Sequence, residues 1–319
     1  MKKILVSGSL AYDFVMNFPD SFKNHIMPDS IHILNVCFMI DKLSKGWGGT
    51  AGNIAYNFKL LGMAPEILSA VGKDGQEYLN HFEQNKISTK NIIRDNNQFT
   101  SSAYITTDVN DNQITAFYNG PLELGLKQNI YEIENPRDYK LAIISPTQKE
   151  VMIKHLKEAK ELGIETVFDP GQQITAFSEI DLKKMLDQSD FLIGNDYEIK
   201  LLQEKTGWDM TKMLEHKKAI ITTMGEKGSV ISTPDGRIME IGICAPRSVD
   251  DPTGAGDAYR AGFFAGYLLG FDFKICGQMG ATASVYAIEN YGTQSHVYTK
   301  EEFAKRYADS FGEEINLNI

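Results

Sequence analysis

The sequence has 319 residues, of which 42% are hydrophobic and 23% charged, enough to bury the core of one large or two smaller α/β domains. Its formal net charge of −10, without any basic run, argues against nucleic acid or a membrane surface as a partner. Three cysteines lie at no metal-like spacing, and no apolar stretch resembles a signal peptide or a membrane span. We therefore expect a cytoplasmic enzyme or binding protein.

The chain begins with a short apolar run, Ile-Leu-Val at residues 4–6. This run predicts a buried strand that ends near Gly8 and is followed by a loop carrying Asp13. A carboxylate just beyond the carboxyl end of a strand lies where α/β sheets bind their ligands. Asp13 is therefore a candidate binding residue.

The first glycine cluster spans residues 46–53 and leads into a helical pattern that ends at Gly62. Gly48 and Gly49 leave open space at the start of this helix. The amide of Asn53 can both donate and accept hydrogen bonds, which suits a ligand that carries hydroxyl groups. The same side chain could instead serve as an N-terminal cap of the helix.

Three segments have alternating or β-rich patterns that differ from the rest of the chain. Residues 30–41 predict a strand with one apolar face, and residues 100–107 and 113–119 predict a hairpin. We expect one small sheet that stands off the main domain as a lid, formed by inserted segments approximately 14–45 and 98–120. The alternative is an edge extension of the main sheet.

From residue 139 onward, short apolar strands alternate with helical patterns. Strands are expected at 141–145, 165–168, 191–193 and 219–222, with helices near 149–162, 180–188 and 196–206. Segments 228–232 and 237–243 suggest an antiparallel continuation, and the chain ends in helices near 273–290 and 300–310. This order predicts an α/β fold with a mostly parallel central sheet covered by helices on both faces. Since no linker interrupts the pattern, we expect a single domain over residues 1–319.

The second glycine cluster, Asp-Pro-Thr-Gly-Ala-Gly-Asp at residues 251–257, precedes a helix expected over 258–269. The first N–H groups of a helix lack intrahelical partners and the helix dipole favours negative charge there. Gly254, Ala255 and Gly256 carry little or no side chain, so an anion could reach these donors. The cluster is either an anion hole with Asp257 as a base beside it, or an ordinary well-capped helix.

Two nucleotide-binding motifs are missing from the sequence. There is no Gly-x-x-x-x-Gly-Lys-Ser/Thr phosphate loop, and the segment after the first strand lacks the glycine spacing of a dinucleotide fingerprint. A P-loop nucleotidase and a nicotinamide-dependent reductase are therefore disfavoured.

Both glycine clusters match one known family. Residues 48–53, Gly-Gly-Thr-Ala-Gly-Asn, resemble the first signature of the ribokinase-like (PfkB) kinases, and residues 251–257 resemble the second. Residues 195–198 resemble the family's Asn-x-x-Glu motif, and residues 223–228 resemble its nucleotide-binding loop. With both signatures in the right order, the chain is identified as similar to this family over nearly its whole length.

The resemblance implies three groups of site residues. The turn that holds the transferred phosphoryl group would be formed by Gly254, Ala255 and Gly256. Asp257 would be the base that accepts the proton of the attacking hydroxyl. The acceptor would contact Asp13, Gly48, Gly49, Asn53 and Phe117. ATP and Mg²⁺ would involve Asn195, Glu198, Thr223, Gly225 and Gly228, with Glu198 acting on Mg²⁺ through water.

The resemblance favours adenosine as the acceptor, phosphorylated on its 5′-hydroxyl to AMP in purine salvage. The opening segment 8–53 and the strand 114–120 are most similar to bacterial and archaeal adenosine or nucleoside kinases. Phe38, Phe117 and Tyr118 could stack on a purine, or could serve lid packing instead. A ribokinase- or fructokinase-type sugar kinase and a broader nucleoside kinase are the alternatives.

Three further questions stay open at this stage. Pro252 stands where sugar kinases of the family often have threonine, beside a monovalent-cation site, so K⁺ activation is undecided. The lid could seal one active site or also pair with a second subunit, giving a monomer or a homodimer. A member that has lost catalysis and binds nucleotide as a regulator is disfavoured by the intact turn and by Asp257.

Overall fold

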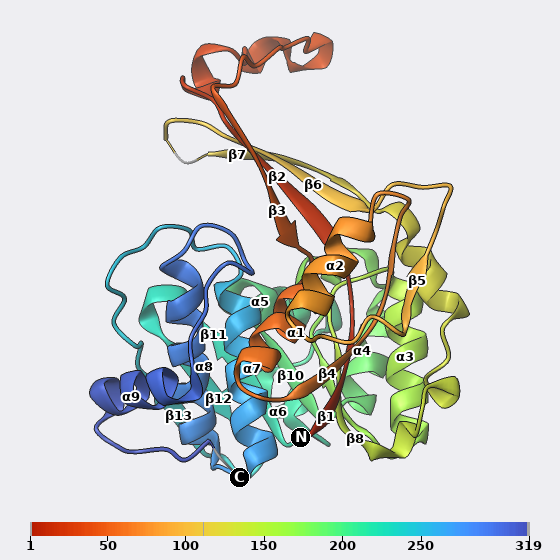
Figure 1. Ribbon diagram of the computed structural model, residues 1–319, viewed down its shortest axis with the longest axis vertical. Helices are drawn as coiled ribbons and strands as arrows, with labels where there is room; N and C mark the ends of the chain where they lie inside the picture. Colours follow the sequence, from red (N-terminus) through yellow and green to blue (C-terminus); the bar gives the residue numbers. More distant parts are fainter. Residues whose placement is uncertain (1, 111, 318–319) are drawn as a thin grey trace.

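The computed structural model describes residues 2–110 and 112–317. A large sheet with helices on both faces forms the body, and a small sheet projects from one end of it (Figure 1). The strands of the large sheet are β1 Lys3–Ser7, β4 Ala64–Val71, β5 Ile92–Arg94, β8 Tyr139–Ile144, β9 Glu165–Phe168, β10 Phe191–Asn195, β11 Ala219–Thr223, β12 Ser229–Ser232 and β13 Ile238–Ile241.

The large sheet has the strand order β13-β12-β11-β10-β9-β8-β1-β4-β5. All neighbours pair in parallel except β11 with β12 and β12 with β13, which pair antiparallel. The predicted mostly parallel sheet with an antiparallel continuation is confirmed. Because parallel strands end at one edge of the sheet, this order brings the loops after β1, β8, β9 and β10 together.

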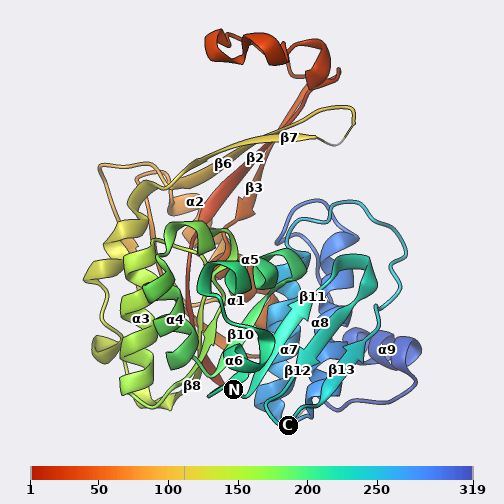
Figure 2. The same ribbon diagram turned by 180° about the vertical axis from the view of Figure 1, so that it is seen from behind.

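Helices cover the large sheet on both faces, as expected (Figures 1 and 2). One face packs against α1 Thr50–Leu60, α7 Ala255–Leu269 and α8 Phe273–Ile288, with α2 Gln76–Gln84 and α9 Lys300–Phe311 joining the same buried cluster. The other packs against α3 Lys149–Glu161, α4 Glu179–Gln188, α5 Asp196–Thr206 and α6 Met210–Leu214. Among the described helices, none is long and apolar enough to cross a membrane.

The strands are continuously apolar because each contributes to two cores. In β8, Leu141 and Ile143 point into the cluster under α1, α7 and α8, whereas Ala142 and Ile144 point into the cluster under α3, α4 and α5. Alternate residues of a strand face opposite sides of a sheet, so a strand covered on both faces needs apolar residues throughout. This burial explains why these strands were recognisable from the sequence.

The small sheet is separate from the large one. It contains β2 Ala11–Asn17, β3 Lys42–Gly48, β6 Ser101–Thr107 and β7 Gln113–Tyr118, in the order β3-β2-β6-β7. β2 pairs antiparallel with β3 and parallel with β6, and β6 pairs antiparallel with β7. The predicted hairpin is confirmed, and the alternative of an edge extension of the main sheet is wrong.

Two predictions for the N-terminal segments are wrong. Residues 30–41 are not a strand: a 3-10 helix spans Pro28–Ile33, and the strand follows it as β3. The alternation here reflects packing at the tip of the sheet, where the ring of Phe38 lies 4.9 Å from that of Phe18 and 5.0 Å from that of Phe22. Asp13 lies within strand β2 rather than in a loop, because only three residues separate β1 from β2.

Candidate active site

The first turn of α7 presents open backbone donors. The helix starts after Gly254, whose φ of 82° is in the left-handed region, and a Cβ there would lie 2.9 Å from the side chain of Thr293. Ala255 donates its N–H to the carbonyl oxygen of Pro252 at 3.3 Å. Within the described residues, the N–H groups of Gly256 and Asp257 have no backbone partner. The helix therefore offers two free donors and its positive end to an anion.

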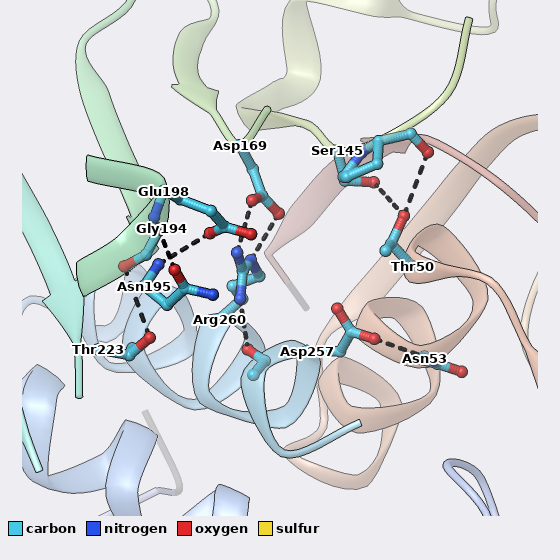
Figure 3. Close-up of polar contacts among 12 residues, drawn as sticks. Thr50, Asn53, Ser145, Asp169, Gly194, Asn195, Glu198, Thr223, Asp257 and Arg260 are labelled. Atoms are coloured by element: carbon cyan, nitrogen blue, oxygen red, sulfur yellow. Dashed lines mark hydrogen bonds and ion pairs between the residues drawn. The ribbon is translucent and has the colours of Figure 1, made fainter. Parts of the chain in front are cut away.

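The structure brings Asn53 and Asp257 together from the starts of α1 and α7, although 204 residues separate them (Figure 3). The amide Nδ2 of Asn53 donates to Oδ2 of Asp257 at 2.8 Å. The amide oxygen of Asn53 accepts from the amide nitrogen of Gln294 at 2.9 Å and lies 2.7 Å from the hydroxyl of Thr293, whose one proton is shared with the carbonyl oxygen of Trp47. Only the second N–H of Asn53 remains for a ligand.

Asp13 depends on the glycines of the first cluster. A Cβ on Gly48 would lie 2.2 Å from the carboxylate of Asp13, so only glycine leaves room for that side chain. Gly49 has a φ of 85°, and a Cβ there would lie 2.6 Å from the backbone of Ala11. The two glycines thus allow α1 and the small sheet to meet closely around the Asp13 carboxylate.

Both aspartates hold protons unusually tightly. Burial raises the pKa of Asp13 to about 7, with further increases from the negative charges of Asp257 and Asp251. Burial raises the pKa of Asp257 to about 6, against the guanidinium of Arg260 and the hydrogen bond from Asn53, which both lower it. Perturbed carboxylates of this kind are typical of catalytic and binding sites.

A buried ion pair adjoins Asp257. The guanidinium of Arg260 donates to both carboxylate oxygens of Asp169, at 2.5 and 2.6 Å, and to the carbonyl oxygen of Gly256 at 3.0 Å. This fork geometry fixes both partners. The sequence analysis did not single out either residue. Asp169 follows β9 directly, so the rule that pointed to Asp13 could have found it, whereas Arg260 carries no motif of its own.

Asn195 and Glu198 form a capping box at the start of α5. The side chain of Asn195 accepts from the N–H of Glu198 at 2.7 Å, and a carboxylate oxygen of Glu198 accepts from the N–H of Asn195 at 2.8 Å. Figure 3 shows Glu198 beside the Asp169–Arg260 pair. Burial and the charge of Asp169 raise the pKa of Glu198.

The described residues contain no group of three or more metal-ligating side chains, so no all-protein cage for a metal is present among them. The carboxylate oxygens of Glu198 and Asp169 nevertheless suit Mg²⁺. This ion commonly keeps several waters and binds through one or two carboxylates and substrate phosphates. The residues therefore fit an ion that is held through water.

Two cavities share the lining residue Gly256 at the start of α7. The larger, about 600 Å³, is lined by Thr223, Gly225 and Gly228 together with apolar side chains such as Val249 and Ile288. The smaller, about 220 Å³, is polar and is lined by Asp169, Glu198, Asp257 and Arg260. Gly256 lines both cavities. An elongated ligand could therefore place an apolar end in the first cavity and an anionic end in the second.

Phe117 lies on the Asp13 face of the small sheet. Asp13 of β2 is paired with Ala103 of β6, and Ala103 is paired with Phe117 of β7, so these side chains point the same way. Phe117 is 48% exposed. Tyr118 points to the opposite face, and Phe38 packs at the sheet's tip, so neither lies beside Asp13.

Comparison with known proteins agrees with this geometry. The model of the pfkB family carbohydrate kinases matches residues 1–300. The chain belongs to this family. It is therefore a phosphotransferase that acts on a hydroxyl acceptor.

Similar proteins include nucleoside kinases. One from Methanocaldococcus jannaschii is 32% identical, over 96% of this chain and 97% of that protein. A Burkholderia thailandensis nucleoside kinase in complex with inosine has a TM-score of 0.89 at 33% identity, covering 98% of this chain and 99% of that one. Its complex with ADP-inosine has a TM-score of 0.86 at 34% identity, covering 98% and 97%. The ribokinase-like fold expected from the two signatures is confirmed.

The raised pKa of Asp13 predicts a pH-dependent effect of Asp13→Asn on stability. Because the folded protein holds this proton more tightly than the unfolded chain, its free energy of unfolding falls as the pH rises from 3.8 to about 7. Asparagine removes the penalty of a buried charge. We expect a melting temperature about 2–5 °C above wild type at pH 8 and a much smaller difference at pH 5.

The measurement is thermal unfolding between pH 5 and 8, with Asp309→Asn as the matched control because Asp309 is exposed. An equal gain at every pH would show that burial of the Asp13 charge is not the cause.

Proposed function

We propose that this kinase transfers the γ-phosphoryl group of ATP to the 5′-hydroxyl of a nucleoside, with adenosine the acceptor favoured by its sequence. The observation that carries the proposal is that both cavities are lined by Gly256, beside Asp257. A nucleoside triphosphate and its acceptor need three features in spatial order: an apolar space, a polar space with helix donors, and a carboxylate base. The two cavities and Asp257 supply them in that order.

The larger cavity suits the donor nucleotide. Its apolar lining fits an adenine ring, while Thr223, Gly225 and Gly228 approach without bulky side chains. The phosphates would then extend toward the free N–H groups of Gly256 and Asp257. The ADP-inosine complex of the Burkholderia thailandensis relative supports a nucleotide and a nucleoside as the two ligands.

The acceptor would lie between the small sheet and α1. Asp13 would accept hydrogen bonds from ribose hydroxyls, and the second N–H of Asn53 could donate to the same sugar. Phe117, on the Asp13 face, would stack on the base. The small sheet would then act as a lid over the acceptor.

In the reaction, the 5′-oxygen of the acceptor forms a bond to the γ-phosphorus while the bond from that phosphorus to the β,γ-bridging oxygen breaks, so ADP leaves. The proton of the hydroxyl passes to Asp257. The N–H groups of Gly256 and Asp257 stabilise the charge on the transferred group. Glu198, through water, would hold Mg²⁺, which when bound neutralises phosphate charge.

The first prediction of this proposal concerns acceptor choice. With MgATP, we expect ADP release to depend on a nucleoside, adenosine or inosine, and to be at least tenfold slower in kcat/KM with ribose or fructose. The assay offers adenosine, inosine, cytidine, ribose and fructose separately, with and without K⁺. Preferential turnover of a free sugar would keep the kinase and refute the nucleoside assignment.

A second prediction concerns the base. Asp257→Asn should lower kcat by about 10²–10⁴-fold, because the amide cannot accept the hydroxyl proton, while the affinity for ATP changes little. Wild-type kcat/KM should fall as the pH drops through about 6, where Asp257 becomes protonated. Steady-state kinetics and calorimetric ATP titration measure both effects. Near-normal turnover of Asp257→Asn would exclude Asp257 as the base.

A third prediction concerns base stacking. Phe117→Ala should raise the KM for the nucleoside about 5- to 30-fold and leave that for ATP unchanged, since stacking is worth roughly 1–2 kcal/mol. Tyr118→Ala is the matched control, because Tyr118 is similarly exposed at 42% but points to the opposite face. Equal effects of the two substitutions would contradict stacking by Phe117.

A further inference from the structure

A chain of buried hydrogen bonds leads from helix α2 to Asp257. His81 of α2 lies 3.1 Å from the amide oxygen of Gln294, through its Nε2. The amide nitrogen of Gln294 lies 2.9 Å from the amide oxygen of Asn53. Asn53 then donates to Asp257 at 2.8 Å. Gln294 is 3% and Asn53 4% exposed, so water does not substitute for these contacts.

The direction of each hydrogen bond in this chain is fixed by its neighbour. Tyr78 has one hydroxyl proton, which it donates to the carbonyl oxygen of Gly48 at 2.6 Å. It therefore accepts from the amide nitrogen of Gln294 at 2.7 Å. The nitrogen of Gln294 is thus held on the side of Tyr78 and Asn53, and its oxygen faces His81. Burial lowers the pKa of His81, which favours the neutral ring with a proton on Nε2.

The same logic fixes the amide of Asn53. Its oxygen accepts from the amide nitrogen of Gln294, and the hydroxyl of Thr293 lies 2.7 Å from it. Rotating the amide by 180° would turn its NH₂ group toward the NH₂ group of Gln294 and its oxygen toward a carboxylate, replacing attraction by repulsion at both ends. Gln294 therefore holds the NH₂ group of Asn53 against Asp257, and Thr293 adds to this when its one proton points to Asn53 rather than to Trp47.

We propose that Gln294, assisted by Thr293, is a positioning residue of the phosphoryl-transfer reaction: it fixes the amide of Asn53 and, through it, the orientation of the Asp257 carboxylate. The proposal rests on the assignment of Asp257 as the base. Among the described residues, Gln294 has no hydrogen bond to Asp257 and lines neither cavity, so its route to Asp257 runs through Asn53.

As a consequence, the two carboxylate oxygens of Asp257 have different functions. Oδ2 accepts from Asn53, which leaves Oδ1 to receive the proton of the acceptor hydroxyl. Orientation matters here because positioning contributes much of the rate in phosphoryl transfer. The hydrogen bond from Asn53 also lowers the pKa of Asp257 against the effect of burial, and so keeps more of the base ionised near neutral pH.

The network also joins Asp257 to the end of strand β3 in the small sheet. The hydroxyl of Thr293 lies 2.7 Å from the carbonyl oxygen of Trp47, and that of Tyr78 binds the carbonyl oxygen of Gly48. Trp47 and Gly48 are the last two residues of β3, which is paired with the strand that carries Asp13. The acceptor-binding side of the site and the base are thus held by one set of hydrogen bonds.

The test is Gln294→Met, which keeps the length of the side chain and removes its donors and acceptor. We expect kcat to fall about tenfold or more, with the KM for ATP within about twofold of wild type. The reason is that the Asn53 amide, no longer held by Gln294, loses its oriented hydrogen bond to the charged Asp257 carboxylate. The acid limb of the kcat/KM profile should move to higher pH, because Asp257 loses an oriented donor.

The matched control is Gln278→Met. Gln278 lies on helix α8, is also buried, at 6% exposure, and lines neither cavity; its amide oxygen accepts from Tyr307 at 2.6 Å. This substitution should cost stability without moving the acid limb. Thermal unfolding of both variants separates a loss of fold from a loss of positioning. Thr293→Val, which removes one donor at constant shape, is the milder second variant and should shift the limb in the same direction.

A double-mutant cycle decides whether Gln294 acts through Asn53. In an Asn53→Ala background, Gln294→Met should cause no further loss of kcat and no further shift of the acid limb. An equal additional loss in that background, or an unmoved limb in the single variant, would overturn the positioning role and leave a purely structural one.

Titration of the Asp257 carboxyl by ¹³C NMR tests the network without turnover. The pKa should be higher in Gln294→Met than in wild type. If wild-type protein phosphorylated no acceptor and the pKa still moved, the proposed function would fail while the network stood. If wild type turned over and the pKa did not move, the inference would fail and the proposed function would stand.

Discussion

The hydrogen bond between Asn53 and Asp257 is the contact on which the site depends, because it joins the starts of α1 and α7. Each helix begins after a glycine in the left-handed region, and at each glycine a Cβ would collide with its surroundings. The glycines therefore do more than open space for a ligand. Gly49 lets α1 approach the start of β2, and Gly254 lets α7 approach Thr293, whose hydroxyl lies 2.7 Å from the amide oxygen of Asn53.

The charge of the site opposes its stability. Asp169, Glu198 and Asp257 lie near Arg260, which is already neutralised by Asp169, and Asp13 lies near Asp257. The raised pKa values of Asp13 and Asp257 measure the free energy spent in holding their charges out of water. These carboxylates favour cationic or hydrogen-bond-donating ligands, whereas the free N–H groups of α7 favour an anion. Ribose hydroxyls and a hydrated divalent ion would each reduce the repulsion among the carboxylates.

The sequence predicted the elements whose pattern is local. Strands buried on both faces, such as 141–145, are apolar throughout, and both glycine clusters mark helix starts. Residues 30–41 misled because packing among rings at the tip of the small sheet imitates strand alternation. Gln294 and Arg260 could not be predicted, since their partners are 241 and 91 residues away and only the fold brings them together.

The register of the small sheet decides which aromatic side chain can meet an acceptor. Side chains alternate along a strand, so Phe117 shares the face of Asp13 while its neighbour Tyr118 does not. On the opposite face, the rings of Phe14 and Tyr104 stack 5.0 Å apart, which helps hold β2 and β6 together. A slip of one residue between β6 and β7 would place Tyr118 on the face of Asp13 and Phe117 on the opposite face. In the proposed site, acceptor recognition would therefore depend on strand pairing as much as on the residues that would touch the acceptor.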